Sequence, residues 1–499
     1  MSERERPEPH EVVIVGGGLS GIGMAATLHR EGIDDYVLLE RGDGLGGTWH
    51  HNIYPGCACD IPSALYSFAF RPTPDWSSMF APQEEIRRYL CDIAAEYDVP
   101  RHTRLHTEML GAAWEDERRV WRIQTSGGEL ESRFLMLGTG SLHAANMVGI
   151  PGVERFQGRM FHSSHWPAGY SGEGERVGVI GTGASSIQLT PGLVNAGAEV
   201  TLFQRTPAWI QPKPNIPHGR FQKAMFRRFP VTQRALRVIE WLFGELFLAG
   251  VTRTWLGNLL GLIPRAHLRA VIRDRDLRAK LTPDYAMGCK RLLVDNTFYQ
   301  AFKRPNLELV TSGVVEIREH SLVAANGVER EVYAIVFATG FHYGVGPSAG
   351  LVRGRDGRSL AQVWDGSPQA YLGTSVAGFP NLALIWGPNT GTTSVAVSVE
   401  SQLVYVREML RTMRREGLDA LDVRKEYEDG FRDLVLEKTG NAVHSVGGCT
   451  SFYLDEKGKN LLLWPGSMIG MWRRLKHFDM APYQAVPAAA PQSVREKTA

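Results

Sequence analysis

The chain has 499 residues, 43% of them apolar and 22% charged, which is the composition of a globular protein with room for about three domains. A formal net charge of +2 is too small to favour nucleic acid or an anionic membrane as a partner. No uninterrupted apolar stretch reaches the roughly 18 residues of a membrane span, so we expect neither nucleic-acid binding nor stable membrane insertion.

The N-terminus indicates a cytoplasmic location, and the cysteine pattern indicates free thiols. Residues 1–10 are charged and contain prolines, so they lack the apolar core of a secretion signal. The cysteines form no CxxC pair and show no His/Cys metal spacing, so we interpret them as reduced thiols and expect no metal site. They are Cys57, Cys59, Cys91, Cys289 and Cys449.

The first predicted element is a strand at Glu11–Val15, a β-branched run typical of a buried parallel strand. A glycine-rich loop follows, then helical spacing over Ile22–Arg30 and a second strand at Tyr36–Leu39. The loop matches GxGxxG, whose glycines let the backbone approach a pyrophosphate at the helix N-terminus. Glu40, at the end of the second strand, would accept hydrogen bonds from a ribose. The candidate cofactor-binding residues here are Gly16, Gly18, Ser20, Gly21 and Glu40.

A second βαβ unit begins with a strand at Arg176–Ile180 and returns to a strand at Glu199–Phe203. Its loop supplies the candidates Gly181, Thr182, Gly183, Ala184, Ser185 and Ser186, with Ser186 in place of the third glycine. The second strand is followed by Arg205 and Thr206 instead of an acidic residue, and Arg205 could pair with a 2′-phosphate. This favours NADPH over NADH, the alternative being a surface arginine.

Two dinucleotide sites imply that NADPH reduces a flavin, with Glu40 suited to FAD. The reduced flavin could pass electrons to a disulfide, to oxygen or to a soluble acceptor. Only Cys57 and Cys59 lie close together, and their CxC spacing is not the usual redox pair. This pattern favours oxygen or a soluble acceptor.

The segment 207–217 is rich in proline and is predicted to form no regular structure. From Arg220 to Lys280 the spacing is helical and arginine-rich, and the run Val238–Ile263 is predicted to form a buried helical hairpin. The basic excess indicates a solvated face, with docking on a membrane or an acidic partner as the alternative. A further strand is predicted at Glu331–Ala338.

Three segments resemble motifs of type I Baeyer-Villiger monooxygenases, a group of the class B flavoprotein monooxygenases. Residues 156–167 are similar to FxGxxxHxxxWP, residues 46–60 to GGxWxxxxYPGxxxD, and residues 337–341 to the ATG linker. Related enzymes that oxidise nitrogen or sulfur carry tyrosine or phenylalanine at the position of Trp166. The resemblance therefore implies FAD, NADPH and O₂ acting on a small-molecule ketone, through a C4a-peroxyflavin, to give an ester or lactone, with sulfide oxidation as a side activity.

The resemblance also implies roles for individual residues. Arg291 would be the catalytic cation, held by Asp60, and Lys290 would bind the NADPH phosphate. Gly47, Thr48 and Trp49 would line the flavin site, and His162 and Trp166 would couple the domains. The alternatives are a helix N-cap for Asp60, and solvated charges for Lys290 and Arg291.

These patterns together predict an α/β fold with two Rossmann-like dinucleotide-binding domains and a helical insertion. We expect the FAD domain at 1–150 and 346–485, the NADPH domain at 151–218 and 283–345, the insertion at 219–282 and a disordered tail at 486–499. The expected enzyme is a Baeyer-Villiger monooxygenase. The alternatives are an N/S-oxidising flavin monooxygenase and an NADPH-dependent flavin reductase that uses Cys57 and Cys59.

Overall fold

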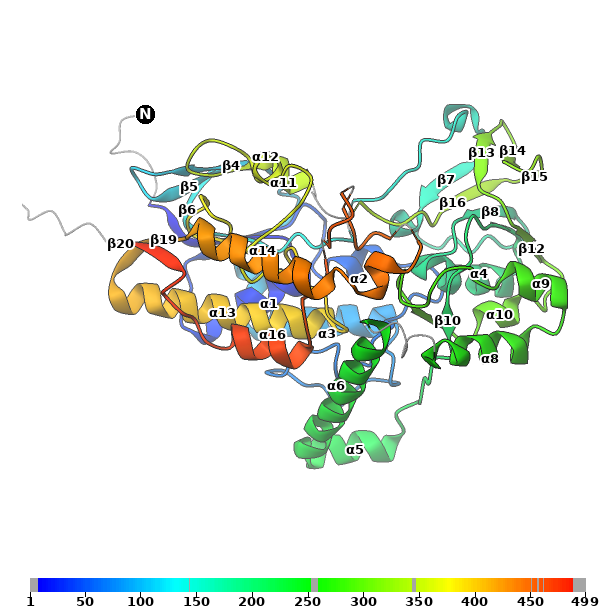
Figure 1. The fold of residues 1–499 in the computed structure, drawn as a ribbon, viewed down its shortest axis with the longest axis horizontal. Coiled ribbons are helices and arrows are strands. Elements are labelled where there is room, and N and C mark those ends of the chain that lie inside the picture. Colours follow the sequence, from blue (N-terminus) through cyan, green and yellow to red (C-terminus); the bar gives the residue numbers. More distant parts are fainter. Residues whose placement is uncertain are drawn as a thin grey trace, which may run out of the picture.

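The structure is a computed structural model, which describes residues 8–142, 144–252, 259–342, 347–449, 451–455, 457–460 and 462–487. Two sheets lie side by side, each covered by helices (Figure 1). This arrangement confirms the predicted α/β class with two Rossmann-like units.

The larger sheet has the strand order β17-β4-β5-β6-β1-β2-β3, with β18 also paired to β6. Strand β1 lies between β6 and β2 in parallel register, so the loop that follows it opens at the carboxyl edge of the sheet, where parallel α/β sheets bind ligands. The strands are β1 (His10–Val15), β2 (Tyr36–Leu39), β3 (Thr103–Arg104), β4 (Met109–Glu115), β5 (Val120–Thr125), β6 (Gly128–Leu137), β17 (Val352–Arg353) and β18 (Leu382–Leu384).

The second sheet has the order β12-β9-β8-β16-β7, and all its neighbouring strands are parallel. Its strands are β7 (Arg159–His162), β8 (Arg176–Ile180), β9 (Glu199–Phe203), β12 (Leu307–Val310) and β16 (Ala334–Phe337). The predicted strand at Glu331–Ala338 covers the end of one strand and the whole of the next, because β15 (Glu329–Glu331) closes a small antiparallel sheet with β13 (Val314–Ile317) and β14 (Ser321–Ala324) before β16 begins.

Two smaller pairings correct the predictions. The proline-rich segment contains a two-residue strand, β10 (Ile210–Gln211), which pairs with β11 (Leu293–Val294) because its residues lie between prolines and keep their backbone groups. The predicted disordered tail begins too early. Residues 486 and 487 belong to β20 (Tyr483–Pro487), which is antiparallel to β19 (Leu418–Val423), and residues 488–499 lie outside the described ranges.

Long helices from both ends of the chain cover the first sheet. Helix α1 packs on α3 and on α13, and α13 packs on α16 (Figure 1). The helices outside the insertion are α1 (Leu19–Arg30), α2 (Thr48–His51), α3 (Gln83–Glu96), α4 (Ala184–Asn195), α10 (Phe298–Ala301), α11 (Pro347–Leu351), α12 (Leu360–Trp364), α13 (Val395–Glu416), α14 (Lys425–Thr439), α15 (Val443–Val446) and α16 (Met468–Leu475).

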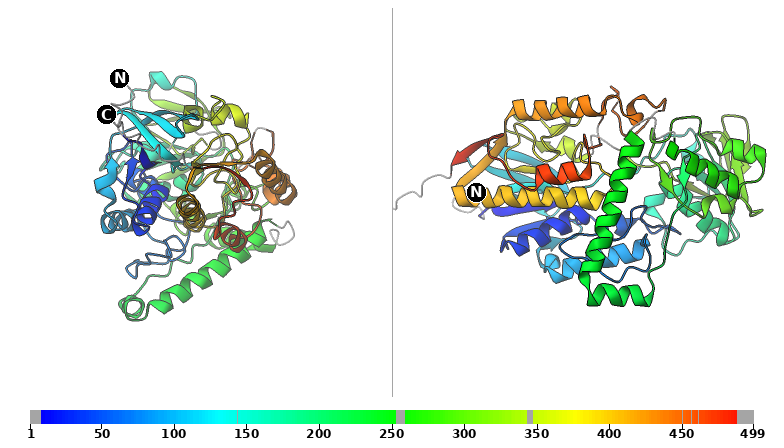
Figure 2. Two further views of the ribbon diagram at one scale, coloured as in Figure 1. Left: turned by 90° about the vertical axis from the view of Figure 1, so that its left-hand side faces the viewer. Right: turned by 60° about the horizontal axis from the view of Figure 1, so that its bottom comes forward.

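The predicted insertion contains α5 (Arg220–Arg228), α6 (Pro230–Thr252), α8 (Leu262–Val271) and α9 (Arg275–Lys280). Helices α5 and α6 project from the body of the molecule (Figure 2). The prediction that the run Val238–Ile263 is buried is wrong, because its residues Val238, Leu242 and Leu246 on α6 are each more than half exposed. Residues 253–258 of that run lie outside the described ranges. The apolar spacing correctly predicts a helix in this region. It does not predict which face of the helix is buried, because burial depends on contacts with residues distant in sequence.

Within these ranges no helix combines the length and apolar character needed to cross a bilayer.

Candidate functional site

One cavity of about 1130 Å³ runs between the two sheets and is lined by residues of both glycine loops. Further walls include residues 46–62, the segment around Arg291 and the C-terminal half of α6. The cavity therefore joins the carboxyl edges of both Rossmann-like units, and each predicted cofactor site opens into the same space.

The first glycine loop turns where only glycine fits. Gly16 has φ +106°, and a Cβ at Gly16 would lie 2.6 Å from the Gly138 carbonyl oxygen. At Gly21 a Cβ would lie 1.9 Å from the Gly16 oxygen, so the third glycine allows α1 to start directly against the loop. Ser20 is buried in the first turn of α1, and Gly18 occupies the N-cap position with no side chain above it. This backbone shape matches a pyrophosphate cradle.

Glu40 is buried at the end of β2, as its predicted role requires, but it also organises the loop. Its Oε2 accepts from the Gly17 backbone N–H and its Oε1 from the Gly42 N–H, each at 2.7 Å. Each carboxylate oxygen can accept a second hydrogen bond, so a ribose hydroxyl can still bind here. The ribose role stays a prediction, and the organising role was missed in the sequence.

The predicted flavin-lining segment packs directly against the first loop. A Cβ at Gly47 would lie 2.7 Å from the Gly18 Cα, and Gly47 has φ +55°. Helix α2 starts at Thr48, and the buried Trp49 donates its indole N–H to the Tyr66 hydroxyl at 3.0 Å. Gly47, Thr48 and Trp49 thus line the cavity next to the glycine loop.

The second glycine loop repeats this geometry. Gly181 has φ +109°, and a Cβ there would lie 2.5 Å from the Ala338 oxygen. Gly183 caps α4, and a Cβ on it would meet nothing within 4 Å, which leaves the open space that a pyrophosphate needs. Ala184 and Ser185 start α4 and line the cavity, whereas Ser186 is fully buried with its hydroxyl 3.4 Å from that of Thr190. The cofactor-binding role of Ser186 stays a prediction, and its burial lets it contact the helix interior only.

The strand-end pair Arg205 and Thr206 lies beside this loop. The Thr206 carbonyl accepts from the Thr182 hydroxyl at 2.8 Å, which ties the loop to the end of β9. Arg205 is exposed at the cavity rim, and Lys290 lines the same cavity from another segment. Partial burial lowers the pKa of Lys290, and the neighbouring positive charge of Arg205 lowers it further. Two neighbouring positive charges that repel each other would both be stabilised by a bound anion, which favours a site for a group such as a 2′-phosphate.

The structure brings Asp60 and Arg291 together although 231 residues separate them. The Arg291 Nη2 lies 2.5 Å from the Asp60 Oδ2, and both side chains keep part of their surface in the cavity, with Asp60 21% and Arg291 38% exposed. Asp60 belongs to the FAD-side wall and Arg291 to the segment after the insertion. Asp60 starts no helix, so the N-cap alternative does not apply.

The prediction of five reduced thiols is wrong, because Cys289 and Cys449 form a disulfide. Spacing could not reveal it: the two positions are 160 residues apart and meet only when the segment after α15 folds back onto the loop that carries Lys290 and Arg291. The bond covalently fixes the residue next to Lys290. A disulfide between positions so far apart in sequence also lowers the conformational entropy of the unfolded chain, which stabilises the folded state.

Alkylation tests this disulfide. In denaturant without reductant we expect mass spectrometry to find three cysteines modified, namely Cys57, Cys59 and Cys91, because these are the free thiols. After reduction all five should react. Five modified cysteines in the unreduced sample would contradict the pairing.

Cys57 and Cys59 are buried free thiols that line the cavity. Burial raises the pKa of Cys57 to about 12 and the pKa of Cys59 further still. Both are therefore protonated at neutral pH, whereas dithiol redox chemistry needs a thiolate. The geometry disfavours a reductase that works through this pair.

His162 and Trp166 occupy the junction between the two units. His162 is buried, with Nε2 2.9 Å from the Gly340 carbonyl oxygen and Nδ1 2.8 Å from the Ser164 hydroxyl. Burial lowers the pKa of His162, so it is neutral at pH 7. Trp166 donates to the Tyr170 carbonyl at 3.0 Å and contacts the Tyr54 ring of the FAD-side wall. Their predicted coupling role stays a prediction, which these contacts support.

Gln188 is a junction residue that the sequence interpretation missed. From α4 it accepts from the Tyr54 hydroxyl at 3.2 Å and from the Ala58 N–H at 3.3 Å, and it donates to the Ala58 carbonyl at 3.1 Å. Little in the sequence marks it, because the same helix also carries the polar residues Ser185, Ser186 and Thr190. It joins the second nucleotide unit to the segment that carries Asp60.

Glu240 is a second missed residue. It projects from α6 into the cavity wall, is 4% exposed, and has one oxygen with no hydrogen-bond partner among the described residues. Burial raises its pKa from 4.5 to about 7, and a hydrogen bond with the Leu65 backbone and the charge of Arg237 only partly offset this. The carboxyl group is thus partly protonated at neutral pH.

The raised pKa makes a stability prediction. The folded protein holds this proton more tightly than the unfolded chain, so Glu240 contributes stability below pH 4.5 that is lost as the pH rises through about 7. Glu240→Gln should therefore raise the melting temperature relative to the parent at about pH 8 more than at about pH 5. Thermal unfolding at both values measures this. A pH-independent difference, or the same trend in the exposed control Glu154→Gln, would contradict it.

Comparison with known proteins places these features among relatives. Residues 13–220 match the model of the pyridine nucleotide-disulphide oxidoreductase family. The chain is 42% identical over 506 residues to a Baeyer-Villiger monooxygenase of Streptomyces coelicolor, covering 100% of this chain and 97% of that protein. It is 40% identical over 489 residues to one of Pseudomonas aeruginosa, covering 96% and 92%. The crystal structure of cyclohexanone monooxygenase from Rhodococcus sp. Phi1 bound to NADP⁺ superposes with a TM-score of 0.86 at 26% identity, covering 97% of this chain and all of that one.

Proposed function

Because this chain belongs to the Baeyer-Villiger monooxygenase family, we propose that it uses NADPH and O₂ to convert a small-molecule ketone to an ester or lactone at the Asp60–Arg291 pair. The observation that carries the proposal is the position of this ion pair. It lies in the one cavity that both dinucleotide loops share, with one partner from each side of the domain junction.

The cofactor assignments follow from the two loops. FAD would occupy the first loop, with Glu40 toward the ribose and with Gly47, Thr48 and Trp49 along its length. NADPH would occupy the second, with Arg205 and Lys290 around the 2′-phosphate. When bound, the flavin supplies the electrons and the activated oxygen.

The chain's own residues would hold and stabilise the reacting groups. The Arg291 guanidinium stays protonated and directs N–H donors into the cavity, where negative charge develops on oxygen during the addition to the ketone carbonyl. Asp60 fixes the orientation of that guanidinium by its 2.5 Å hydrogen bond and offsets the cost of its partial burial. Two partly buried apolar residues of α6 that line the cavity, Phe247 and Leu248, would exclude water from the ketone.

A product assay tests the function. Purified holoenzyme is incubated with NADPH and air and with a panel of cyclic, aromatic and steroid ketones, and products are identified by mass spectrometry. We expect a product heavier by one oxygen atom, which takes its label from ¹⁸O₂ and not from labelled water. Oxidation of sulfides or amines with no ketone converted would favour the N/S-monooxygenase alternative, which no feature of the site supports.

We infer that the enzyme acts in the cytoplasm, where NADPH is supplied. Fractionation of the producing cells, with NADPH-dependent ketone oxidation measured in each fraction, tests this. Activity confined to a periplasmic or secreted fraction would contradict it.

A further inference from the structure

Helix α6 turns its polar side inward and its apolar side outward. The inward side chains bind the body of the protein by polar contacts: Gln233 donates to the Thr73 carbonyl, and Arg237 donates to the carbonyls of Ala64 and Ser67 and pairs with Glu400 at 3.0 Å. One turn on from Glu240, Glu245 accepts from the Ile469 N–H at 2.6 Å. A surface helix of a globular protein normally has the opposite orientation.

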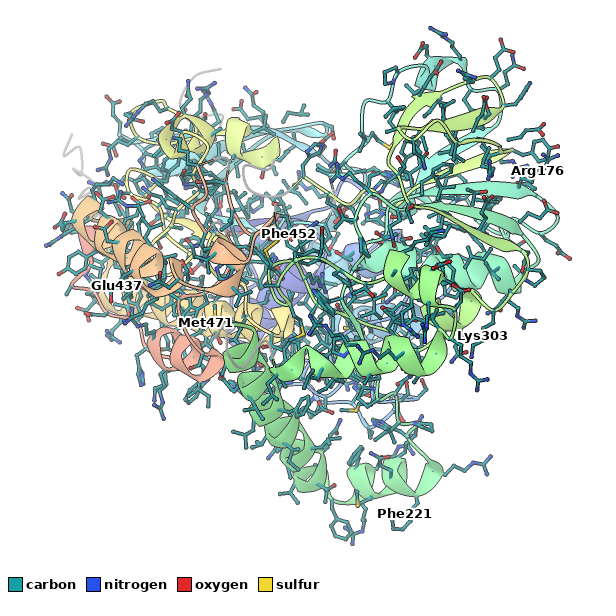
Figure 3. All side chains as sticks on the ribbon, turned by 45° about the vertical axis from the view of Figure 1, so that its right-hand side comes forward. Arg176, Phe221, Lys303, Glu437, Phe452 and Met471 are labelled. Carbon is teal, nitrogen blue, oxygen red and sulfur yellow. A yellow bond between two sulfur atoms is a disulfide. The ribbon has the colours of Figure 1, made fainter. Side chains whose placement is uncertain are left out.

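The outward side forms a continuous apolar stripe. On α6 Val231, Val238, Leu242 and Leu246 are separated by seven, four and four residues, with Ile239 beside them, so they lie on one face of the helix and span about 22 Å. At the tip Phe221 of α5 is 85% exposed, and it projects away from the protein in Figure 3. We call this surface the α5–α6 apolar face. It comprises Phe221, Phe229, Val231, Val238, Ile239, Leu242 and Leu246, each at least 55% exposed. Phe243, which is 65% exposed and also touches the cavity, lies at the border of this face.

Positive charge borders this face. Residues 220–236 contain five cations and no aspartate or glutamate: Arg220, Lys223, Arg227, Arg228 and Arg234. Among the described residues, one of these five, Arg227, has an acidic partner, Asp75. The chain as a whole carries a net charge of only +2, so the cationic excess is local to these two helices.

An exposed apolar stripe with a cationic border is the pattern of a helix that lies in a membrane interface. We propose that the α5–α6 apolar face docks the enzyme peripherally on an anionic lipid bilayer, with the stripe in the acyl boundary and the bordering arginines on lipid phosphates. A second copy of this chain fits less well, because a symmetric dimer through this face would bring the same cations against each other. The docking involves no spanning helix and lies beside the catalytic cavity without requiring any of its residues.

Vesicle binding tests the proposal. FAD-loaded enzyme is co-sedimented with vesicles of phosphatidylcholine alone or mixed equally with phosphatidylglycerol. We expect binding to the mixed vesicles that weakens with added salt, and much weaker binding to phosphatidylcholine. The double variant Leu242→Glu, Leu246→Glu should bind at least about tenfold more weakly. Arg228→Gln with Arg234→Gln should cost about thirtyfold on the mixed vesicles only.

Leu110→Glu is the matched control. Leu110 lies on β4, far from α6 in the fold, and is 52% exposed, so its replacement adds the same charge to an exposed leucine without touching the face. Ketone turnover in buffer without lipid should be unchanged in all variants, which shows that they fold, since none of the replaced residues lines the cavity. Equal vesicle binding by the parent and the Leu242→Glu, Leu246→Glu variant would overturn the proposal. So would a lipid-free dimer in sedimentation velocity that this variant dissociates.

Discussion

Arg291→Ala is expected to lower ester formation at least about 100-fold while NADPH is still consumed. The substitution removes the fixed cation at the point where negative charge develops, but it leaves both dinucleotide loops intact. Oxygen reduced without a stabilised addition step should then leave as hydrogen peroxide. The measurement is the ratio of ester formed to NADPH oxidised, with peroxide assayed in parallel.

Two companion variants sharpen this experiment. Asp60→Asn keeps the size of the side chain and removes its charge, so it should lower coupling less than the loss of Arg291 itself, because the guanidinium remains but is less firmly held. Arg41→Ala is the control: Arg41 also lines the cavity but is about half exposed and lies at the end of β2. A normal ester yield from Arg291→Ala would show that Arg291 has no role in the oxygenation step, whatever the yield of the Asp60→Asn variant.

Arg205→Ala is expected to raise the KM for NADPH by about 10- to 100-fold and to leave the KM for NADH nearly unchanged. The 2′-phosphate is the group that distinguishes these cofactors, and a charge-assisted contact to it exists only with NADPH. Steady-state NADPH and NADH oxidation at fixed ketone concentration gives both constants.

Lys290 provides an independent check on the same anion. Since the Arg205 charge helps to lower the pKa of Lys290, removing Arg205 should let the Lys290 pKa rise in the cofactor-free enzyme. Lys290→Ala combined with Arg205→Ala should then show non-additive losses in NADPH affinity. Arg176→Ala is the control, because Arg176 starts β8 at the opposite edge of the same sheet and lies at the periphery in Figure 3. Equal effects on NADPH and NADH would contradict the 2′-phosphate role.

Structure that depends on residues close together in the sequence was predicted well, and structure that depends on distant residues was not. Strands at Arg176–Ile180 and Glu199–Phe203 were predicted to the residue, because β-branched runs next to glycine turns encode their structure locally. The close approach of Asp60 to Arg291 was expected only through resemblance to a family, since no spacing rule relates positions in different domains.

The wrong predictions concern contacts between residues that are far apart in the sequence. Pairing of Cys289 with Cys449 and the inverted orientation of α6 both depend on which surfaces meet after folding. The inversion was hidden because a helical period gives the width of an apolar stripe but not the side it faces. Gln188 was overlooked for a similar reason: a buried amide has no distinctive pattern until the backbone groups it bridges are known.

The same helix also has consequences for how such enzymes diversify. Phe247 and Leu248 of α6 line the cavity, whereas Val238 and Leu242 are more than half exposed and do not. Because the two sets sit on separate sides of one rigid rod, mutations that reshape ketone choice can accumulate without altering what the outer side does, and the reverse. Directed evolution of this chain can therefore draw two independent libraries from a single 23-residue helix.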